Sequence, residues 1–341
     1  MANEVKVYEN YKEIPHAVYE YVKKNALVQH YPIMGKAFSY PYFYYYFVSY
    51  DVENEINAIL PLVIYKGEYG NVAHSLPYFS YSGIIGDEIG VHAIQRKIDS
   101  FLKEKEVITL SYCHHPFMNY SRNIKHDYQF ENFFQYLELT SGSYTDKMNS
   151  KARNNLKRNL KKANAFKVVL EKSESTSDLS YWYNNIYVKR LEETHAPIYP
   201  YAIYEALFTA PHHRTQFIVA KIDEKIIGGA LYLLQVDSID LFMRVVESKY
   251  LHTQAGVLMD KFIIEQAELN KFKYFNWQSA DFIDSPVFNY KKSWGSDVGT
   301  HLYLTNEVKN FKSFQTLTKD KLKSSYPGMY IAPYSVIFNE N

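Results

Sequence analysis

The spacing of apolar residues between positions 215 and 280 constrains the fold of this chain more than any other feature. Three apolar runs, each long enough for one strand, are separated by polar turns, and a stretch with helical spacing precedes a fourth run. We therefore expect hairpins first and a helical crossover last. The strands are predicted at 217–222, 226–235, 239–246 and 274–278, and the helix at 255–270.

The first half of the chain repeats this order more loosely. Strands are predicted at 44–50, 56–65, 71–78 and 107–112, and a helix at 91–103. Two copies of one order, in a chain of 341 residues, indicate a duplicated α/β module. We expect an N-terminal domain over residues 1–145 and a C-terminal domain over residues 166–341, joined by residues 146–165.

The joining segment is strongly basic. Residues 147–167 contain eight lysines and arginines and no acidic residue. Ala152, Leu156, Leu160 and Ala163 repeat with helical spacing, so the segment is predicted to be an amphipathic helix that packs on a domain. A charged run is usually a solvated face, but like charges one turn apart repel each other. Their crowding favours a bound polyanion.

Composition excludes several classes of protein. The 38 basic and 37 acidic residues rule out a globally basic coat for DNA. No apolar run approaches the roughly 18 residues that a membrane span needs. Residues 1–20 hold no apolar block typical of a secretory signal, so we expect a cytoplasmic protein. The single Cys113 forbids an intrachain disulfide.

Familiar catalytic motifs are absent from the sequence. There is no phosphate-binding GxxxxGK[ST], no dinucleotide-binding GxGxxG, and no HExxH, CxxC or GxSxG. We predict no metal site, because the neighbouring residues of the pairs His114–His115 and His212–His213 would point to opposite faces of a strand. The 34 tyrosines suit a pocket for sugars, bases or phosphates, although A/T-rich codon usage would also produce them.

The chain resembles the FemAB-like branch of the GNAT acyltransferase superfamily. The resemblance covers roughly residues 40–305. Four stretches carry it. They are the Leu-Pro and Tyr-x-Gly segment at 75–83, the basic helix at 151–163, the turn before a helix at 194–200, and the strand end at 275–277 together with the Tyr-Lys-Lys-Ser-Trp-Gly segment at 290–295. It implies an α/β fold of two tandem GNAT-like domains, each a mixed, mainly antiparallel sheet flanked by helices.

The resemblance also implies a substrate class. The helical arm with which Fem peptidoglycan enzymes hold aminoacyl-tRNA has no counterpart in this sequence, which favours an acyl-thioester donor. Relatives of this size act on amino sugars linked to dTDP or UDP in surface-polysaccharide pathways. We therefore expect an N-acyltransferase with acyl-CoA as co-substrate, no tightly bound cofactor and no metal.

Residues on the donor side are predicted around the third strand of the second copy. The oxyanion would be bound by a backbone N–H between Arg244 and Val246. The segment from Gln254 to Gly256 would begin a helix, and a helix N-terminus suits a pyrophosphate, although a polar loop ending in an N-cap would look the same.

The catalytic groups are less sharply defined. Accepting the proton of the amine falls to His195, to Asp281 or to water. His195 could instead fix its turn, and Asp281 could cap the next helix. Lys291 would supply a cation near the phosphates or the reacting carbonyl, unless it stacks on Trp294 at the surface.

Acceptor-binding residues are assigned on both domains. Arg153 and Lys157 would bind the pyrophosphate of the nucleotide, and Tyr78, Tyr81 and Ser82 would line the acceptor cleft unless they serve only in packing or a turn. The resemblance adds three positions near the fourth strand of the second copy: Trp277, Gln278 and Tyr290. The family has Gly-Arg where Gln278 and Ser279 stand, so an anion contact from that arginine is in doubt.

Two other functions remain open. An aminoacyl-tRNA-dependent Fem-type transferase acting on a peptidoglycan precursor would share the fold and the basic helix. A non-enzymatic protein that binds RNA or polysaccharide would use the same helix and tyrosines.

Overall fold

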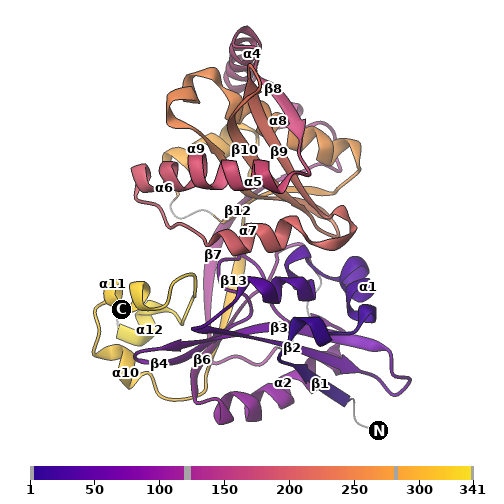
Figure 1. The fold of residues 1–341 in the computed structure, drawn as a ribbon, viewed down its shortest axis with the longest axis vertical. Coiled ribbons are helices and arrows are strands. Elements are labelled where there is room, and N and C mark those ends of the chain that lie inside the picture. Colours follow the sequence, from indigo (N-terminus) through magenta and orange to yellow (C-terminus); the bar gives the residue numbers. More distant parts are fainter. Residues whose placement is uncertain (1–3, 119–123, 280–282, 339–341) are drawn as a thin grey trace. The chain divides into compact units, whose positions relative to one another are not determined.

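The computed structural model describes residues 4–118, 124–279 and 283–338 (Figure 1). The chain divides into a first unit, Met1–Asn132 with His301–Asn341, and a second unit, Phe133–Thr300. Each unit is built on a sheet, and each sheet contains one parallel pair among antiparallel neighbours.

The sheet of the first unit has the strand order β1-β2-β3-β4-β6-β13. β4 and β6 are parallel, and the other neighbours with a described register are antiparallel. The bounds are β1 Glu4–Tyr8, β2 Tyr42–Tyr50, β3 Ile56–Gly67, β4 Gly70–His74, β6 Val107–Cys113 and β13 Asp297–Glu307, with β5, Ile85–Gly86, beside β3.

Helices cover this sheet. α2, Glu88–Glu104, packs its apolar face on β2 and β3, and Asp87 caps its start by accepting a hydrogen bond from Gly90 N–H at 2.7 Å. Four further helices complete the unit: α1 His16–Asn25, α10 Lys312–Gln315, α11 Lys319–Ser325 and α12 Tyr334–Phe338.

The sheet of the second unit has the order β8-β9-β10-β11-β12-β7. Here β11 and β12 are the parallel pair. The bounds are β7 Tyr128–Glu138, β8 Val169–Lys172, β9 Thr215–Ile222, β10 Lys225–Leu234, β11 Ser238–Val246 and β12 Tyr274–Ser279. The helices are α3 Tyr144–Lys147, α4 Ser150–Ala165, α5 Thr176–Trp182, α6 Val188–Thr194, α7 Tyr201–Phe208, α8 Ala255–Leu269 and α9 Pro286–Ser293.

The predicted repeat is confirmed. In each unit two antiparallel hairpin steps lead to a strand that is joined through a helix to a parallel neighbour, β4 to β6 through α2 and β11 to β12 through α8. One strand is shorter than expected: the strand predicted at 71–78 ends at His74, and Tyr78 has a positive φ of 70° that a strand does not accommodate.

The last strand of each sheet comes from the other half of the sequence. β7 follows β6 along the chain, but its second half pairs with β12. β13 follows β12, and its second half pairs with β6. Because of this exchange, residues 301–341 pack in the first unit, whereas the sequence analysis assigned everything after residue 165 to the second domain.

The predicted basic helix is α4 in the second unit. Asn149 caps it by accepting a hydrogen bond from Ala152 N–H at 2.8 Å. Its expected apolar stripe is confirmed: Ala152, Leu156 and Ala163 lie in the core of the second unit, and Leu160 packs against it. Among the described residues, no helix is long and apolar enough to cross a bilayer.

Candidate active site at the divergence of β11 and β12

β11 and β12 pair over a short distance only. The parallel register joins Ser238–Asp240 to Tyr274–Asn276 and stops there, although β11 continues to Val246. Within the described part of the chain, the stretch 241–246 therefore has β10 on one side and no strand register on the other. A strand edge of this kind can offer backbone groups to a ligand, although Val245 O already accepts a hydrogen bond from Trp182 Nε1 at 3.4 Å.

The first turn of α8 lies beside the end of β11. Gln254 adopts a left-handed conformation with a φ of 65° just before the helix, and its side chain does not cap the free N–H groups. A Cβ on Gly256 would lie 2.5 Å from Nη1 of Arg244 and 3.8 Å from Cγ2 of Val246. The missing side chain at Gly256 leaves room for the Arg244 guanidinium, so the first turn of α8 and the end of β11 lie next to each other.

A buried ion pair holds this surface together. Arg244 Nε contacts Asp260 Oδ1 at 2.7 Å, and the Tyr290 hydroxyl donates a hydrogen bond to Asp260 Oδ2 at 2.5 Å. The Arg244 guanidinium also lies over the Tyr290 ring, 5.7 Å from its centroid. Asp260 is completely buried, whereas the Arg244 side chain keeps 26% of its surface exposed. Asp260 thus holds the Nε edge of the guanidinium, and about a quarter of the Arg244 side chain stays exposed.

Burial has the largest single effect on the pKa of each of these groups. It raises the pKa of Asp260, against the opposing effect of the Arg244 charge and the Tyr290 hydrogen bond. Burial alone would lower the pKa of Arg244, but the Asp260 carboxylate outweighs it, so the pKa of Arg244 is raised. Burial also raises the pKa of Tyr290 well above its usual value, with Asp260 adding to the effect. Arg244 therefore stays positive and Tyr290 stays a hydrogen-bond donor at neutral pH.

The end of β12 brings further predicted residues to the same place. Lys291 on α9 donates hydrogen bonds to the carbonyl oxygens of Trp277 at 3.0 Å and Ser279 at 3.4 Å, rather than only stacking on Trp294. Trp277 is buried and donates through Nε1 to Ser296 Oγ at 2.6 Å. Gln278 has a positive φ of 65°, and its N–H bonds to Asn276 Oδ1 at 2.8 Å. β12 thus ends in a kinked segment that α9 covers.

The predicted bases are not placed at this surface by the structure. His195 is exposed and ends α6 in a left-handed conformation with a φ of 53°. Its backbone N–H bonds to the Glu192 carbonyl, so fixing a turn accounts for what is seen. Asp281 lies outside the described residues.

The basic residues chosen for the acceptor lie along α4. Arg153 donates to the Thr145 carbonyl at 3.3 Å and to Ser150 Oγ at 3.5 Å, and Lys157 is exposed. α4 runs antiparallel to α8: Tyr144 N–H bonds to Glu268 at one end, and Phe166 contacts His252 at the other. Arg153 therefore lies near the end of α8 that is remote from Gly256, about 20 Å along the helix from Phe166.

The tyrosines predicted for the acceptor cleft are in the first unit. Tyr78 is half-buried, and its hydroxyl bonds to that of Tyr42 at 2.7 Å. Tyr81 and Ser82 are buried, with exposed fractions of 1% and 0%. Burial favours packing for both, and their role in binding stays a prediction.

Asp260 is the residue that the sequence analysis missed. It lies among apolar α8 positions, with Met259, Ile263 and Ile264 buried around it. An acidic residue inside an apolar stripe is unusual unless it is paired, and that signal was available in the sequence.

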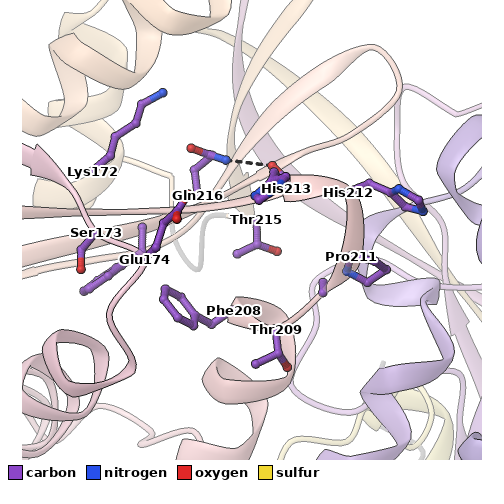
Figure 2. Close-up of a pocket in the computed structure, with 12 residues that line it drawn as sticks. Lys172, Ser173, Glu174, Phe208, Thr209, Pro211, His212, His213, Thr215 and Gln216 are labelled. Carbon is purple, nitrogen blue, oxygen red and sulfur yellow. Dashed lines mark hydrogen bonds between the residues drawn. The ribbon is translucent and has the colours of Figure 1, made fainter.

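A separate pocket of about 300 Å³ lies between the end of β8, the end of α7 and the start of β9 (Figure 2). Phe208 and Phe217 supply apolar walls, and Gln216 donates to the His213 carbonyl at 2.8 Å. None of the predicted site residues lines it. No group of three or more His, Cys, Asp or Glu side chains suited to a metal occurs in the described ranges.

Comparisons with known proteins match this fold. Residues 150–292 match the sequence family of the acetyltransferase (GNAT) domain. The crystal structure of FemX superposes with a TM-score of 0.63 at 10% identity, covering 92% of this chain and 99% of FemX. No curated protein matches in sequence.

Two further solved structures share the fold. The C-terminal domain of a putative lysylphosphatidylglycerol synthetase from Agrobacterium fabrum has a TM-score of 0.60 at 10% identity, covering 94% of this chain and 99% of that one. L-PGS from Bacillus licheniformis has a TM-score of 0.53 at 10% identity, covering 89% and 95%. Residues 150–292, which lie in the second unit, are therefore similar in sequence to an acetyltransferase (GNAT) domain, and the chain as a whole has the fold of FemX.

Proposed function

We propose that the chain transfers an acyl group from acyl-CoA to the amino group of a dTDP- or UDP-linked amino sugar, in surface-polysaccharide biosynthesis. The observation that carries this proposal is the divergence of β11 and β12 beside the N-terminus of α8, where the Gln254 side chain makes no capping bond. It offers, on one surface, a strand edge for the reacting carbonyl and a positive helix end for the donor phosphates.

The donor's pyrophosphate would lie at the first turn of α8. Free N–H groups and the helix dipole favour an anion there. Gly256 presents its backbone without a side chain, and Nη1 of the Arg244 guanidinium lies beside it. An arginine held by a buried carboxylate is pre-organised for a phosphate, because little side-chain freedom is lost on binding.

The reaction is a direct attack. The neutral amine nitrogen forms a bond to the thioester carbon, the carbonyl oxygen becomes an oxyanion, and the carbon–sulfur bond then breaks to release the thiolate of CoA. Backbone N–H groups of residues 241–246 would stabilise the oxyanion, and the Lys291 ammonium adds positive charge near the end of β12. The proton that leaves the nitrogen passes to water, His195 or Asp281, and the thiolate is protonated.

The acceptor is the finer part of the proposal. The abundant tyrosines and the basic helix motivate a nucleotide sugar, but Arg153 already bonds within its own helix start. We therefore assign the donor phosphates to Arg244 and α8, and keep Arg153 and Lys157 as residues to be tested for the acceptor.

A thiol-release assay tests this function. Purified protein is mixed with several acyl-CoAs and a panel of nucleotide-linked amino sugars, free amino acids and polyamines. We expect amine-dependent release of CoA with at least one amino sugar, unaffected by RNase. Arg244→Gln should lower kcat/KM at least tenfold, whereas Arg158→Gln, on the exposed face of α4, should not. Turnover only on free amino acids would overturn the sugar acceptor, and no release with any acyl-CoA would overturn the donor.

Aminoacyl transfer is the second candidate. It is favoured by the acid-free basic face of α4 and by the fold shared with FemX and with the C-terminal domain of a putative lysylphosphatidylglycerol synthetase. Under this function, activity should require aminoacyl-tRNA, disappear after RNase treatment, and release no thiol from acyl-CoA.

A further inference from the structure

We propose that α4 docks the protein on an anionic lipid surface. This inference goes beyond the proposed function, because it concerns where the chain works and not which bond it makes. The docking face consists of the exposed cations of α4: Lys151, Lys157, Arg158, Lys161 and Lys162. Three exposed apolar side chains flank it: Phe166, Val169 and Leu251.

The cations occupy the side of α4 that faces away from the core. At about 100° per residue, Lys151, Lys157, Arg158, Lys161 and Lys162 fall within an arc of roughly 140°. The buried residues Ala152, Leu156 and Ala163 fall on the opposite side. A straight helix that is basic along one side can lie flat against a charged plane, which is the geometry of interfacial helices.

These charges have no acidic neighbours that compensate them. Among the described residues, no ion pair joins the exposed cations of α4 to a carboxylate, and Arg158 bonds to the neutral Asn155 side chain at 3.1 Å. The cations also repel one another along the helix. A surface of anionic headgroups would remove this repulsion over the whole face at once, whereas a single diphosphate could contact only part of it.

Apolar side chains lie at one end of the basic face. Phe166 is 41% exposed, Val169 is 53% exposed and Leu251 is 46% exposed. The Phe166 ring contacts the His252 ring with centroids 4.9 Å apart, so the segment that carries Leu251 lies beside the end of α4. A bilayer can take up all three side chains at its acyl boundary, whereas RNA bases would stack only on Phe166 and offer nothing equivalent to the aliphatic Val169 and Leu251. This end therefore favours lipid over nucleic acid.

Vesicle sedimentation tests the proposal. The full chain is incubated without substrate with vesicles of phosphatidylcholine alone or with about 30% phosphatidylglycerol, at low salt and at high salt. We expect binding only to the anionic vesicles, and loss of binding at high salt because screening shortens the reach of the charges. Each basic residue near an anionic surface strengthens binding about fivefold, so Arg158→Glu/Lys162→Glu should weaken it about a hundredfold or more.

Matched variants separate docking from folding and catalysis. Lys23→Glu/Lys24→Glu reverses two exposed charges on α1 and should leave vesicle binding unchanged. Phe166→Ser should weaken it several-fold. The α4 variant should keep wild-type thermal unfolding and thiol release with soluble substrates. The proposal is overturned if anionic vesicles do not bind at low salt, if both double variants behave alike, or if a mixed tRNA probe binds while vesicles do not.

Discussion

Arg244 and Asp260 form the contact on which the candidate site depends most. Burying a carboxylate without a partner is strongly unfavourable, and Asp260 is fully buried. Arg244 Nε supplies a counter-charge at Asp260 Oδ1 and Tyr290 donates a hydrogen bond to Oδ2, and these contacts hold the guanidinium beside Gly256. The buried carboxylate is unfavourable for folding, but it holds the positive charge of Arg244 in place at the N-terminus of α8.

Asp260→Asn should destabilise the protein by about 3 kcal/mol, because it leaves the Arg244 charge partly buried without its counter-ion. The free energy of unfolding in urea measures this. Asp237→Asn is the matched control, since Asp237 pairs with Lys273 at the surface at 3.0 Å and should cost less than about 1 kcal/mol. Equal losses for both variants would show that the buried pair has no special weight.

Helices and strands within each unit were predictable because their signals are local. The apolar run at 226–235 and the helical spacing at 255–270 agree with β10 and α8 to within a residue or two. The prediction of the α4 helix followed from the helical spacing of its apolar residues. The exchange of β7 and β13 between the sheets has no local signal, because pairing of Phe275 with Leu137 joins residues far apart in sequence.

The candidate site was predictable only in part for the same reason. Gln254 and Gly256 follow from the end of a strand and the start of a helix, and both lie where expected. The contact of Arg244 with Asp260 joins the side chains of β11 and α8. The spacing of apolar residues predicts each element but not which side chains of the two will meet. For His195, the side-chain chemistry predicts a catalytic base, and this stays a prediction. Its left-handed backbone accounts for the end of α6.

The packing of α4 on the core of the second unit gives a prediction at the scale of one element. Leu156→Ala should lower the free energy of unfolding by about 2–3 kcal/mol, because Leu156 is 9% exposed in the core cluster of the second unit and its removal leaves a cavity. Lys157→Ala, one residue away on the exposed face, should change it by less than about 0.5 kcal/mol. Chemical denaturation of the two variants provides the comparison, and similar small effects would mean that α4 is not packed as described.

At the scale of the whole molecule, the first unit concentrates buried histidines. Burial lowers the pKa of His74 to about 4, of His114 to about 3 and of His301 to about 4. Each is neutral in the folded chain, whereas in the unfolded chain it takes up a proton near its ordinary value of about 6.5. Between the lowered pKa values and about 6.5, the unfolded state therefore binds more protons than the folded state does.

Acidification should consequently destabilise the protein. The stability is complete above about pH 6.5 and is lost as the pH falls toward about 4, by up to about 3 kcal/mol for each of these histidines. Thermal unfolding followed between pH 7 and pH 4 measures the effect. His301→Gln should make the dependence on pH shallower, and a melting temperature that does not fall with acid would contradict the buried, neutral histidines.

The most direct test of the acyl-transfer site is hydrogen–deuterium exchange with and without acetyl-CoA. The account predicts slower amide exchange in the first turn of α8, residues 255–259, and along residues 241–246 of β11, and a loss of this protection in Arg244→Gln. Protection confined to residues 208–217 around the pocket of Figure 2, or none in either segment, would contradict it.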